Sequence, residues 1–291
     1  MVMTPDIDDL PYTERRGVKY FELVAEPVIQ EILPGIFIQG WGYNGSIPGP
    51  TIKAYPGDCI NIRVYNSLNE PTSVHWHGLD IPKDMDGVKI QHGEYIDHRF
   101  RLVNPPGTHM YHTHFNVAKQ EMMGLAGGLI ILDPCESEQC SFEYLLILQE
   151  FAVKGLRMGE LKPGRFEVEP LSDDLNFFTI NGRSFPNTSM LPVRAGERIR
   201  IRIANPGMKA HPMHLHGHQF LVVSADGNDL NACARMLKNT VLVASGETYD
   251  IEFVADNPGN WPFHCHIPHH TANNMTPETG GMFTTLCYIR E

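Results

Sequence analysis

The sequence has no apolar run long enough to cross a membrane and no block of basic residues. A membrane-spanning helix needs about 20 consecutive apolar residues, so we expect no membrane partner. The formal charge of −11 disfavours a nucleic-acid partner, because binding to phosphates depends on clustered lysine and arginine. The first residues, "MVMTPDIDDLPYTERRG", also lack the basic and apolar regions of a signal peptide. We therefore expect either a cytoplasmic chain or a secreted or periplasmic protein whose signal has been removed.

Cysteine is scarce as well. Of the six cysteines, Cys265 lies among histidines in "WPFHCHIPHH", and the other five form an odd set that cannot pair completely. Cys135 and Cys140 bracket "ESEQ" in a polar stretch. They are equally compatible with a small disulfide and with two buried thiols.

Helical periodicity is nearly absent, and short alternating segments take its place. Ile60, Ile62 and Val64 alternate with polar neighbours, and the isoleucines in "RIRIRIA" (198–204) alternate with arginines. A period of two predicts half-buried strands. With 22 prolines and 26 glycines for turns, the chain is predicted to be all-β and built of Greek-key sandwiches. Its 291 residues suffice for two such domains.

The histidine pairs reveal an internal repeat. "HWHG" (75–78) corresponds to "HLHG" (214–217), and "YHTH" (111–114) corresponds to "FHCH" (263–266). Gly57 and Gly196 each lie eighteen residues before the first His-x-His pair of their copy, which begins at His75 or His214. We therefore predict two copies of one domain in tandem, with an insertion near "GNDLNACARML". The predicted parts are an N-terminal extension and first strand (1–34), a first domain (35–134), a linker (135–143) and a second domain (144–291).

The four His-x-His pairs predict metal binding. On a strand, residues i and i+2 project to the same face, so each pair presents two imidazoles side by side. A zinc site needs four ligands, and structural zinc prefers cysteine. Eight imidazoles favour a cluster of several copper ions, because imidazole suits copper.

A second metal group surrounds Cys265. His270 follows it by five residues and Met275 by ten, while His211 lies upstream in "HPMHLHGH". One thiolate, two imidazoles and an axial thioether form the ligand set of a blue-copper electron-transfer site. Met282 in "GGM" is a rival axial ligand, but the repeat aligns it with Leu129 at the start of a strand, so Met275 is preferred. His264 and His266 point to the opposite face from Cys265, so this strand serves both sites.

Together, "HWHG", "YHTH", "HPMHLHGH" and "HCHIPHHTANNM" resemble the four copper-binding motifs of the multicopper oxidases. With two domains, the chain is similar to the small-laccase branch, which implies cupredoxin-like domains and four coppers per subunit: one type 1, one type 2 and two type 3. By this resemblance the type 2 copper binds His75 and His214. The type 3 pair binds six further histidines: His77, His112, His114, His216, His264 and His266. The type 1 copper binds four residues: His211, Cys265, His270 and Met275.

The resemblance implies the reaction. Phenolic or aromatic amine substrates would each lose one electron at the type 1 copper, where Cys265 passes electrons on, and dioxygen would be reduced by four electrons to water. Asp86 in "DMDGVKIQHG" lies where the family places a proton-delivering carboxylate; otherwise it is a turn residue. Three positions depart from the family pattern, namely His109, Thr271 and Asn274. His92, His98 and His218 have no ligand spacing, whereas His269 neighbours the ligand His270 and is expected either to support it or to be exposed.

Three other functions are alternatives to a laccase-like oxidase. A metal-ion oxidase acting on cuprous, ferrous or manganous ions and a copper-resistance protein both stay open. A copper nitrite reductase carries its type 1 cysteine in the first domain, where this chain has Thr113, and is disfavoured.

Assembly follows from the distribution of the pairs. Each domain supplies two His-x-His pairs, so a complete cluster needs a first and a second domain facing each other. Cyclic symmetry lets identical subunits satisfy such a head-to-tail contact. We therefore predict a homotrimer with the clusters at its subunit interfaces.

Overall fold

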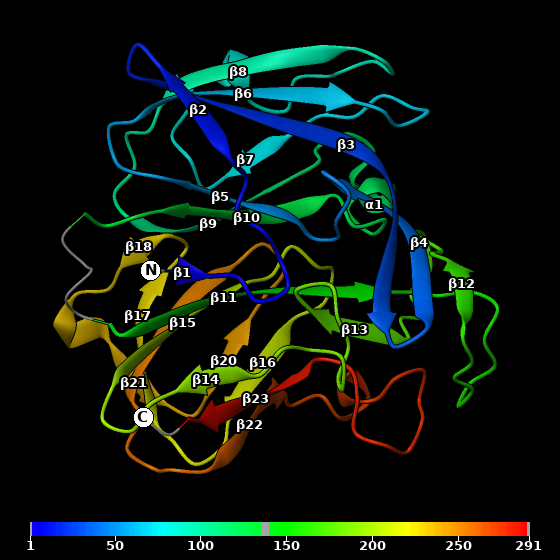
Figure 1. Cartoon of the computed structure of the whole chain (residues 1–291), viewed down its shortest axis with the longest axis vertical. Coiled ribbons are helices and arrows are strands. Elements are labelled where there is room, and N and C mark those ends of the chain that lie inside the picture. The colour runs from blue at the N-terminus through cyan, green and yellow to red at the C-terminus, as the bar shows by residue number, and fades with distance from the viewer. Residues whose placement is uncertain (1, 135–139, 290–291) are drawn as a thin grey trace.

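The computed structural model describes residues 2–134 and 140–289, which form four β-sheets (Figure 1). The predicted all-β class is confirmed. The described helical segments are single turns: α1 (Val117–Gln120), η1 (Lys83–Met85), η3 (Ala232–Ala234) and η4 (Pro268–Thr271). No described helix has the length and apolar character needed to span a membrane.

The first sandwich packs a six-stranded sheet on a four-stranded sheet. The larger sheet contains β2 (Tyr12–Arg15), β3 (Val18–Leu33), β4 (Ile36–Tyr43), β6 (Cys59–Asn66), β8 (Tyr95–Arg101) and β12 (Gly164–Glu167). The smaller sheet contains β5 (Gly49–Ala54), β7 (His75–His77), β9 (Gly107–His112) and β10 (Ala126–Ile131). One apolar core lies between them, with Ile62 of β6 and Trp76 of β7 both fully buried.

The second sandwich repeats this plan with eight and five strands. The larger sheet contains β1 (Val2–Met3), β11 (Phe142–Phe151), β13 (Phe177–Ile180), β15 (Arg198–Ala204), β17 (Phe220–Ala225), β18 (Asn228–Asp229), β19 (Met236–Lys238) and β21 (Thr248–Val254). The smaller sheet contains β14 (Leu191–Val193), β16 (His211–Leu215), β20 (Thr240–Val243), β22 (Asn260–Cys265) and β23 (Phe283–Tyr288). Cys265 belongs to the core between these two sheets.

Two short strands pair across the two sandwiches. β1 pairs in parallel with β11, so the N-terminus adds to the second sandwich before the chain enters the first. β12 lies in a segment whose sequence predicts an irregular loop, and it pairs in parallel with β4 of the first sandwich, so that β4 lies between β12 and β3. The domain boundaries stay predictions, and residues 135–139 of the predicted linker, including Cys135, lie outside the described residues. Cys140 is buried, and its thiol donates to Glu252 Oε1 at 3.7 Å.

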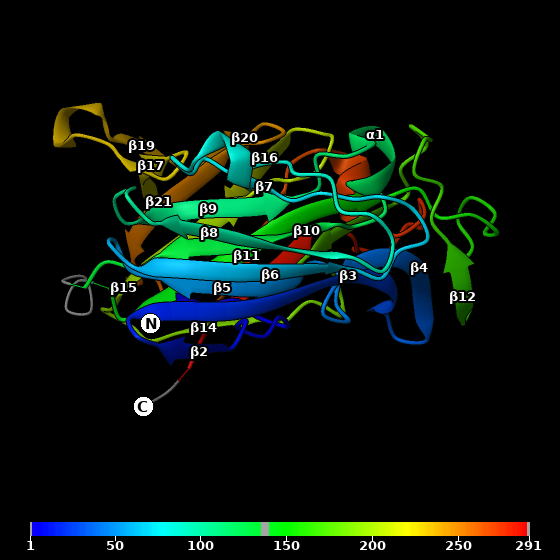
Figure 2. The same cartoon turned by 90° about the horizontal axis from the view of Figure 1, so that it is seen from above.

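The sandwiches lie side by side (Figures 1 and 2), joined by buried polar contacts. Thr108 of β9 donates through Oγ1 to Asp250 of β21 at 2.7 Å, and its carbonyl accepts from Thr248 Oγ1 at 2.9 Å. Arg202 of β15 donates to the same hydroxyl at 3.0 Å and to Asp250 at 2.8 Å. These bonds hold β9, which ends in His112, against the second sandwich.

Candidate metal centre

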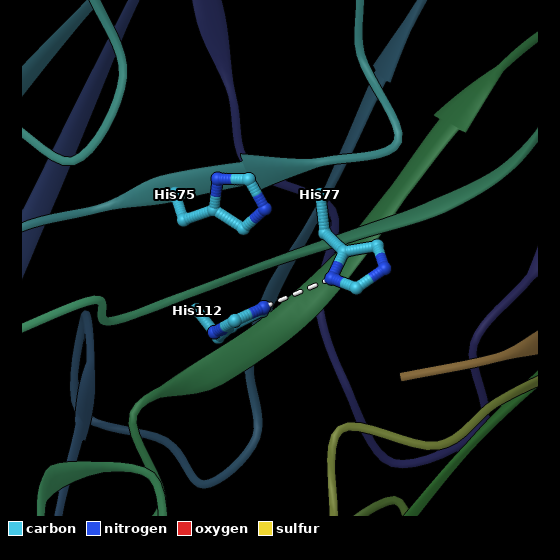
Figure 3. Close-up of side chains that lie close together, drawn as sticks. All are labelled: His75, His77 and His112. Atoms are coloured by element: carbon cyan, nitrogen blue, oxygen red, sulfur yellow. Dashed lines mark hydrogen bonds between the residues drawn. The ribbon is translucent and has the colours of Figure 1, made fainter. Parts of the chain in front are cut away.

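Strands β7 and β9 bring three of the predicted ligands together in the first sandwich. Their antiparallel register sets His75 opposite His112. The central residue of β7, Trp76, points into the core, so His75 and His77 share the other face. One ring nitrogen from each of His75, His77 and His112 lies within 4.8 Å of the others, and the rings face one another (Figure 3). His114 joins this group, because its ring centroid lies 5.4 Å from that of His75.

Asp86 fixes the orientation of His75. The His75 Nδ1–H donates to the carboxylate, whose oxygens lie 2.8 and 2.9 Å away, and the Trp76 backbone N–H donates to Oδ1 at 3.2 Å. Because Nδ1 carries the hydrogen, Nε2 of His75 keeps its lone pair for a metal. The structure therefore places Asp86 beside the predicted ligand.

A second carboxylate, which the sequence analysis missed, holds His112. The His112 Nδ1–H faces the Glu121 carboxylate just after α1 and also lies 2.9 Å from the Thr113 carbonyl oxygen. Nε2 of His112 is then left 3.0 Å from Nδ1 of His77. Burial, followed by the neighbouring His112 and His75, lowers the pKa of His77 to about 4. Neutral imidazoles with converging lone pairs suit a cation.

Strands β16 and β22 build a matching group in the second sandwich. His214 lies opposite His264 in the ladder, and Nε2 of His216 lies 3.0 Å from Nε2 of His264. His266 completes the group at 5.4 Å from His214 between ring centroids. Nδ1 of His264 donates to the Cys265 carbonyl at 2.8 Å, so Nε2 of His264 keeps its lone pair for a metal. Burial comes first among the causes that lower the pKa of both His216 and His264.

The eight histidines thus form two groups of four within one chain, here called the first and second half-clusters. Among the described residues, ring contacts between these ligands join members of the same half-cluster only. Each half-cluster also keeps partly exposed imidazoles. Within one chain, the eight histidines therefore lie in two separate groups.

The third group consists of His211, Cys265 and His270 and is enclosed. His211 and Cys265 are fully buried, and His270 is 4% exposed. Cys265 Sγ lies 3.6 Å from Nδ1 of His211 and 3.4 Å from Nδ1 of His270, and these nitrogens are 3.1 Å apart. Burial raises the pKa of the Cys265 thiol to about 12 and lowers the pKa of His270 to about 3. In this site, a thiolate requires a bound cation to balance its charge.

Two methionines are candidates for the fourth residue of this group, and they differ in burial. Met275 is 39% exposed and follows Asn274 in left-handed backbone, with φ of 61° and 47°. Met282 is fully buried; its N–H donates to the His270 carbonyl at 2.9 Å, and its carbonyl accepts from the Cys265 N–H at 3.0 Å. Met275 therefore stays the prediction from the sequence for the axial ligand, and Met282 is the buried alternative.

The remaining histidines lie outside these groups. His109 is 3% exposed, and its Nε2 has no hydrogen-bond partner among the described residues. It borders a cavity of about 350 Å³ together with His77, while its ring packs beneath Gly227 of the second sandwich. His269 packs against Phe178 and His270. The other three bond elsewhere: His92 to the Leu68 carbonyl, His98 to the Met85 carbonyl and His218 to the Tyr288 hydroxyl.

The donor chemistry fits copper at all three groups. Imidazole nitrogens are common copper ligands, and a buried thiolate with two imidazoles matches an electron-transfer copper site. Two β-sandwiches with these groups on the smaller sheet of each define a copper-binding oxidoreductase class.

Comparison with known proteins identifies the family. Two multicopper oxidase profiles match residues 31–136 and 161–278. The solved blue copper oxidase from Nitrosomonas europaea is 30% identical, with a TM-score of 0.80, covering 92% of this chain and 85% of that one. This chain belongs to the multicopper oxidase family, in its two-domain form, and its domains are cupredoxin-like. The family consists of copper-dependent oxidoreductases that use oxygen.

Two longer relatives are matched only in part. Multicopper oxidase MmcO of Mycobacterium tuberculosis (strain ATCC 25618 / H37Rv) is 32% identical over 77% of this chain and 49% of its own length. A probable nitrite reductase-hydroxylamine oxidoreductase fusion protein of Kuenenia stuttgartiensis is 28% identical over 90% of this chain and 31% of its own length. The chain therefore spans about half or less of these two relatives.

Proposed function

We propose that this protein is a laccase-like oxidase that takes single electrons from phenolic or aromatic amine substrates and reduces dioxygen to water. The observation that carries the proposal is the pairing of an enclosed thiolate group with two half-clusters. At the end of β22, Cys265 faces the core. Its two neighbours in sequence, His264 and His266, both belong to the second half-cluster. One strand end therefore connects the site of electron entry to the oxygen site.

The proposed copper content is four per subunit. His211, Cys265 and His270 would hold the type 1 copper, with Met275 or its buried rival Met282 as the axial residue. His75 and His214 would hold the type 2 copper, and the remaining six histidines of the half-clusters would hold the type 3 pair. When bound, these coppers supply one-electron transfer at the thiolate and storage of the four electrons that dioxygen requires.

The protein's own groups fix the ligands and supply protons. Asp86 and Glu121 hold Nδ1–H of His75 and His112, so both rings keep Nε2 directed at the cluster. The Asp86 side chain is 34% exposed and so reaches water on one side and His75 on the other. In this proposal its carboxyl transfers protons from solvent to the oxygen site.

The half-clusters support a homotrimer. In a closed ring of three chains, the first half-cluster of one subunit faces the second half-cluster of the next, and each interface completes eight imidazoles. Copper binding and assembly then stabilise each other, because the metal binds the assembled state. Light scattering of the copper-loaded protein tests this arrangement, and a fully active monomer with four coppers would contradict it.

A metal-ion oxidase is the second candidate, and the surface near the thiolate group supports it. Met158, Met208 and Met275 are 81%, 41% and 39% exposed. The backbone of Met208 is bonded to Glu150 behind His211, and Gly159, next to Met158, donates to the Asn274 carbonyl at 2.7 Å. Exposed thioethers suit cuprous ions as substrate.

One set of assays separates the candidates. Oxygen uptake is measured with phenols, aromatic amines, and cuprous, ferrous and manganous ions, each with and without the triple variant Met158→Leu, Met208→Leu and Met275→Leu. Laccase-like activity predicts rapid uptake with phenols and little effect of the variant. Uptake only with cuprous ion, lost in the variant, would favour the metal-ion oxidase, and nitrite consumption without oxygen uptake would contradict both.

A further inference from the structure

A fully buried carboxylate lies directly behind the thiolate group. Glu150, near the end of β11, and His211, which it contacts, both have side chains with no exposed surface. Burying a carboxylate is costly unless its oxygens accept hydrogen bonds. The surrounding sequence, "YLLILQEFAV", is otherwise that of an apolar core strand.

Three N–H groups meet this carboxylate. Oε1 accepts from the backbone N–H of Met208 and, at 2.7 Å, of Lys209. Oε2 lies 3.3 Å from Nε2 of His211. A Cβ at Gly207 would lie 2.2 Å from Oε2, so the glycine makes room for the carboxylate. Glu150 therefore acts as an acceptor towards both backbone N–H groups.

This contact determines which nitrogen His211 offers to a metal. Because Nε2 carries the hydrogen donated to Glu150, Nδ1 keeps its lone pair. Nδ1 is the atom that faces Cys265 Sγ and His270 Nδ1. The opposite tautomer would direct a hydrogen at the metal site.

The two imidazoles are supported by one strand pair but in different ways. Glu150 of β11 lies opposite Phe178 of β13 in the ladder. The Phe178 ring stacks on His270 with 4.0 Å between centroids. His270 thus packs against an aromatic ring, whereas His211 contacts a carboxylate.

We propose that Glu150 is a positioning residue of the type 1 copper site that fixes the His211 tautomer and lowers the reduction potential of the copper. This rests on the proposed function, since it requires copper at the thiolate group. A negative charge close to the ligand stabilises the more positive oxidation state of the metal, and the low dielectric of the buried site strengthens that effect.

The central test compares Glu150→Gln with Glu143→Gln. Glu143 is a second buried carboxylate on β11, bonded to Arg202 and not to His211, so its variant controls for removal of a buried charge from this strand. The copper-loaded, full-length proteins are titrated to equilibrium with a redox mediator. At a given solution potential, we expect the ratio of reduced to oxidised type 1 copper to be at least tenfold higher in Glu150→Gln than in the wild type. This corresponds to about 59 mV for one electron. Glu143→Gln should leave the potential unchanged.

An unchanged or lower potential in folded, copper-loaded Glu150→Gln would overturn the proposal. An equal rise in Glu143→Gln would do the same, because the effect would then not depend on contact with His211. Activity is not needed for this readout.

A measurement on the copper-free wild-type protein keeps the proposal testable if the variant does not fold. Nitrogen-15 NMR of the histidine rings is expected to show His211 with hydrogen on Nε2, and hydrogen on Nδ1 would refute the assignment. Failure of the proposed function is distinguishable, because wild-type protein lacking thiolate-to-copper absorption would contradict the copper site whatever the His211 tautomer.

Discussion

Asp86→Asn removes a proton-carrying group from the first half-cluster while keeping its shape. Asparagine can still accept the bond from Nδ1 of His75, so the ring should stay in place. General acid catalysis contributes about 10²- to 10⁴-fold. Because the Asp86 side chain is 34% exposed, water can partly replace it as a proton donor. We therefore expect an effect at the lower end of this range. Reoxidation should slow about 100-fold, or about 2.7 kcal/mol in activation free energy at 1.36 kcal/mol per tenfold.

Stopped-flow absorption measures the two halves of the reaction separately. Reduced enzyme is mixed with oxygenated buffer to follow reoxidation, and oxidised enzyme is mixed with an anaerobic electron donor to follow reduction. Reduction should be unaffected, because Asp86 does not contact the thiolate group. Asp84→Asn is the matched control: Asp84 is an exposed carboxylate on η1, two residues away. Wild-type reoxidation in Asp86→Asn would refute proton delivery and leave Asp86 as a turn residue that orients His75.

Three further predictions concern the thiolate group. Cys265→Ser should abolish the blue absorption and electron entry but retain the half-cluster coppers, and retained blue colour would contradict the assignment. Met282→Leu should shift the blue absorption and the reduction potential, whereas Met275→Leu should change neither; electronic spectra and mediator titrations distinguish them, and the reverse pattern would support Met275 instead. Burial lowers the pKa of His270 to about 3, against about 6.5 in an unfolded chain. The unfolded chain therefore binds the proton first, so the free energy of unfolding of the copper-free protein should fall as pH decreases from about 6.5 towards 3, as urea denaturation at pH 7 and 4.5 would detect. Equal stability at both pH values would show that this imidazole is not held neutral.

The strands and the histidine pairs could be read from the sequence because both depend on local backbone geometry. Alternation of side chains is a property of any extended chain, so Ile60, Ile62 and Val64 had to share a face, and in the structure all three are fully buried. The same rule joined His75 to His77 and His214 to His216. The repeat then indicated two sandwiches without reference to any long-range contact.

The axial methionine of the thiolate group could not be identified from the alternation of side chains. Ten residues separate Cys265 from Met275, but spacing does not say whether a loop stays against the core. Only the tertiary structure shows that Met275 is 39% exposed in left-handed backbone, whereas Met282 is fully buried and its backbone is bonded to His270 and Cys265.

The supporting carboxylates also required the tertiary structure. Glu121 meets His112 only because α1 folds back over the end of β9, and Glu150 meets His211 across 61 residues of sequence. The apolar sequence around Glu150 indicates a buried position, but no local pattern shows which histidine either glutamate contacts. Their partners are fixed by the packing of sheets, which depends on contacts between distant segments. Local periodicity therefore determined which side chains could bind metal, whereas packing decided which groups orient them and which of the two methionines is buried.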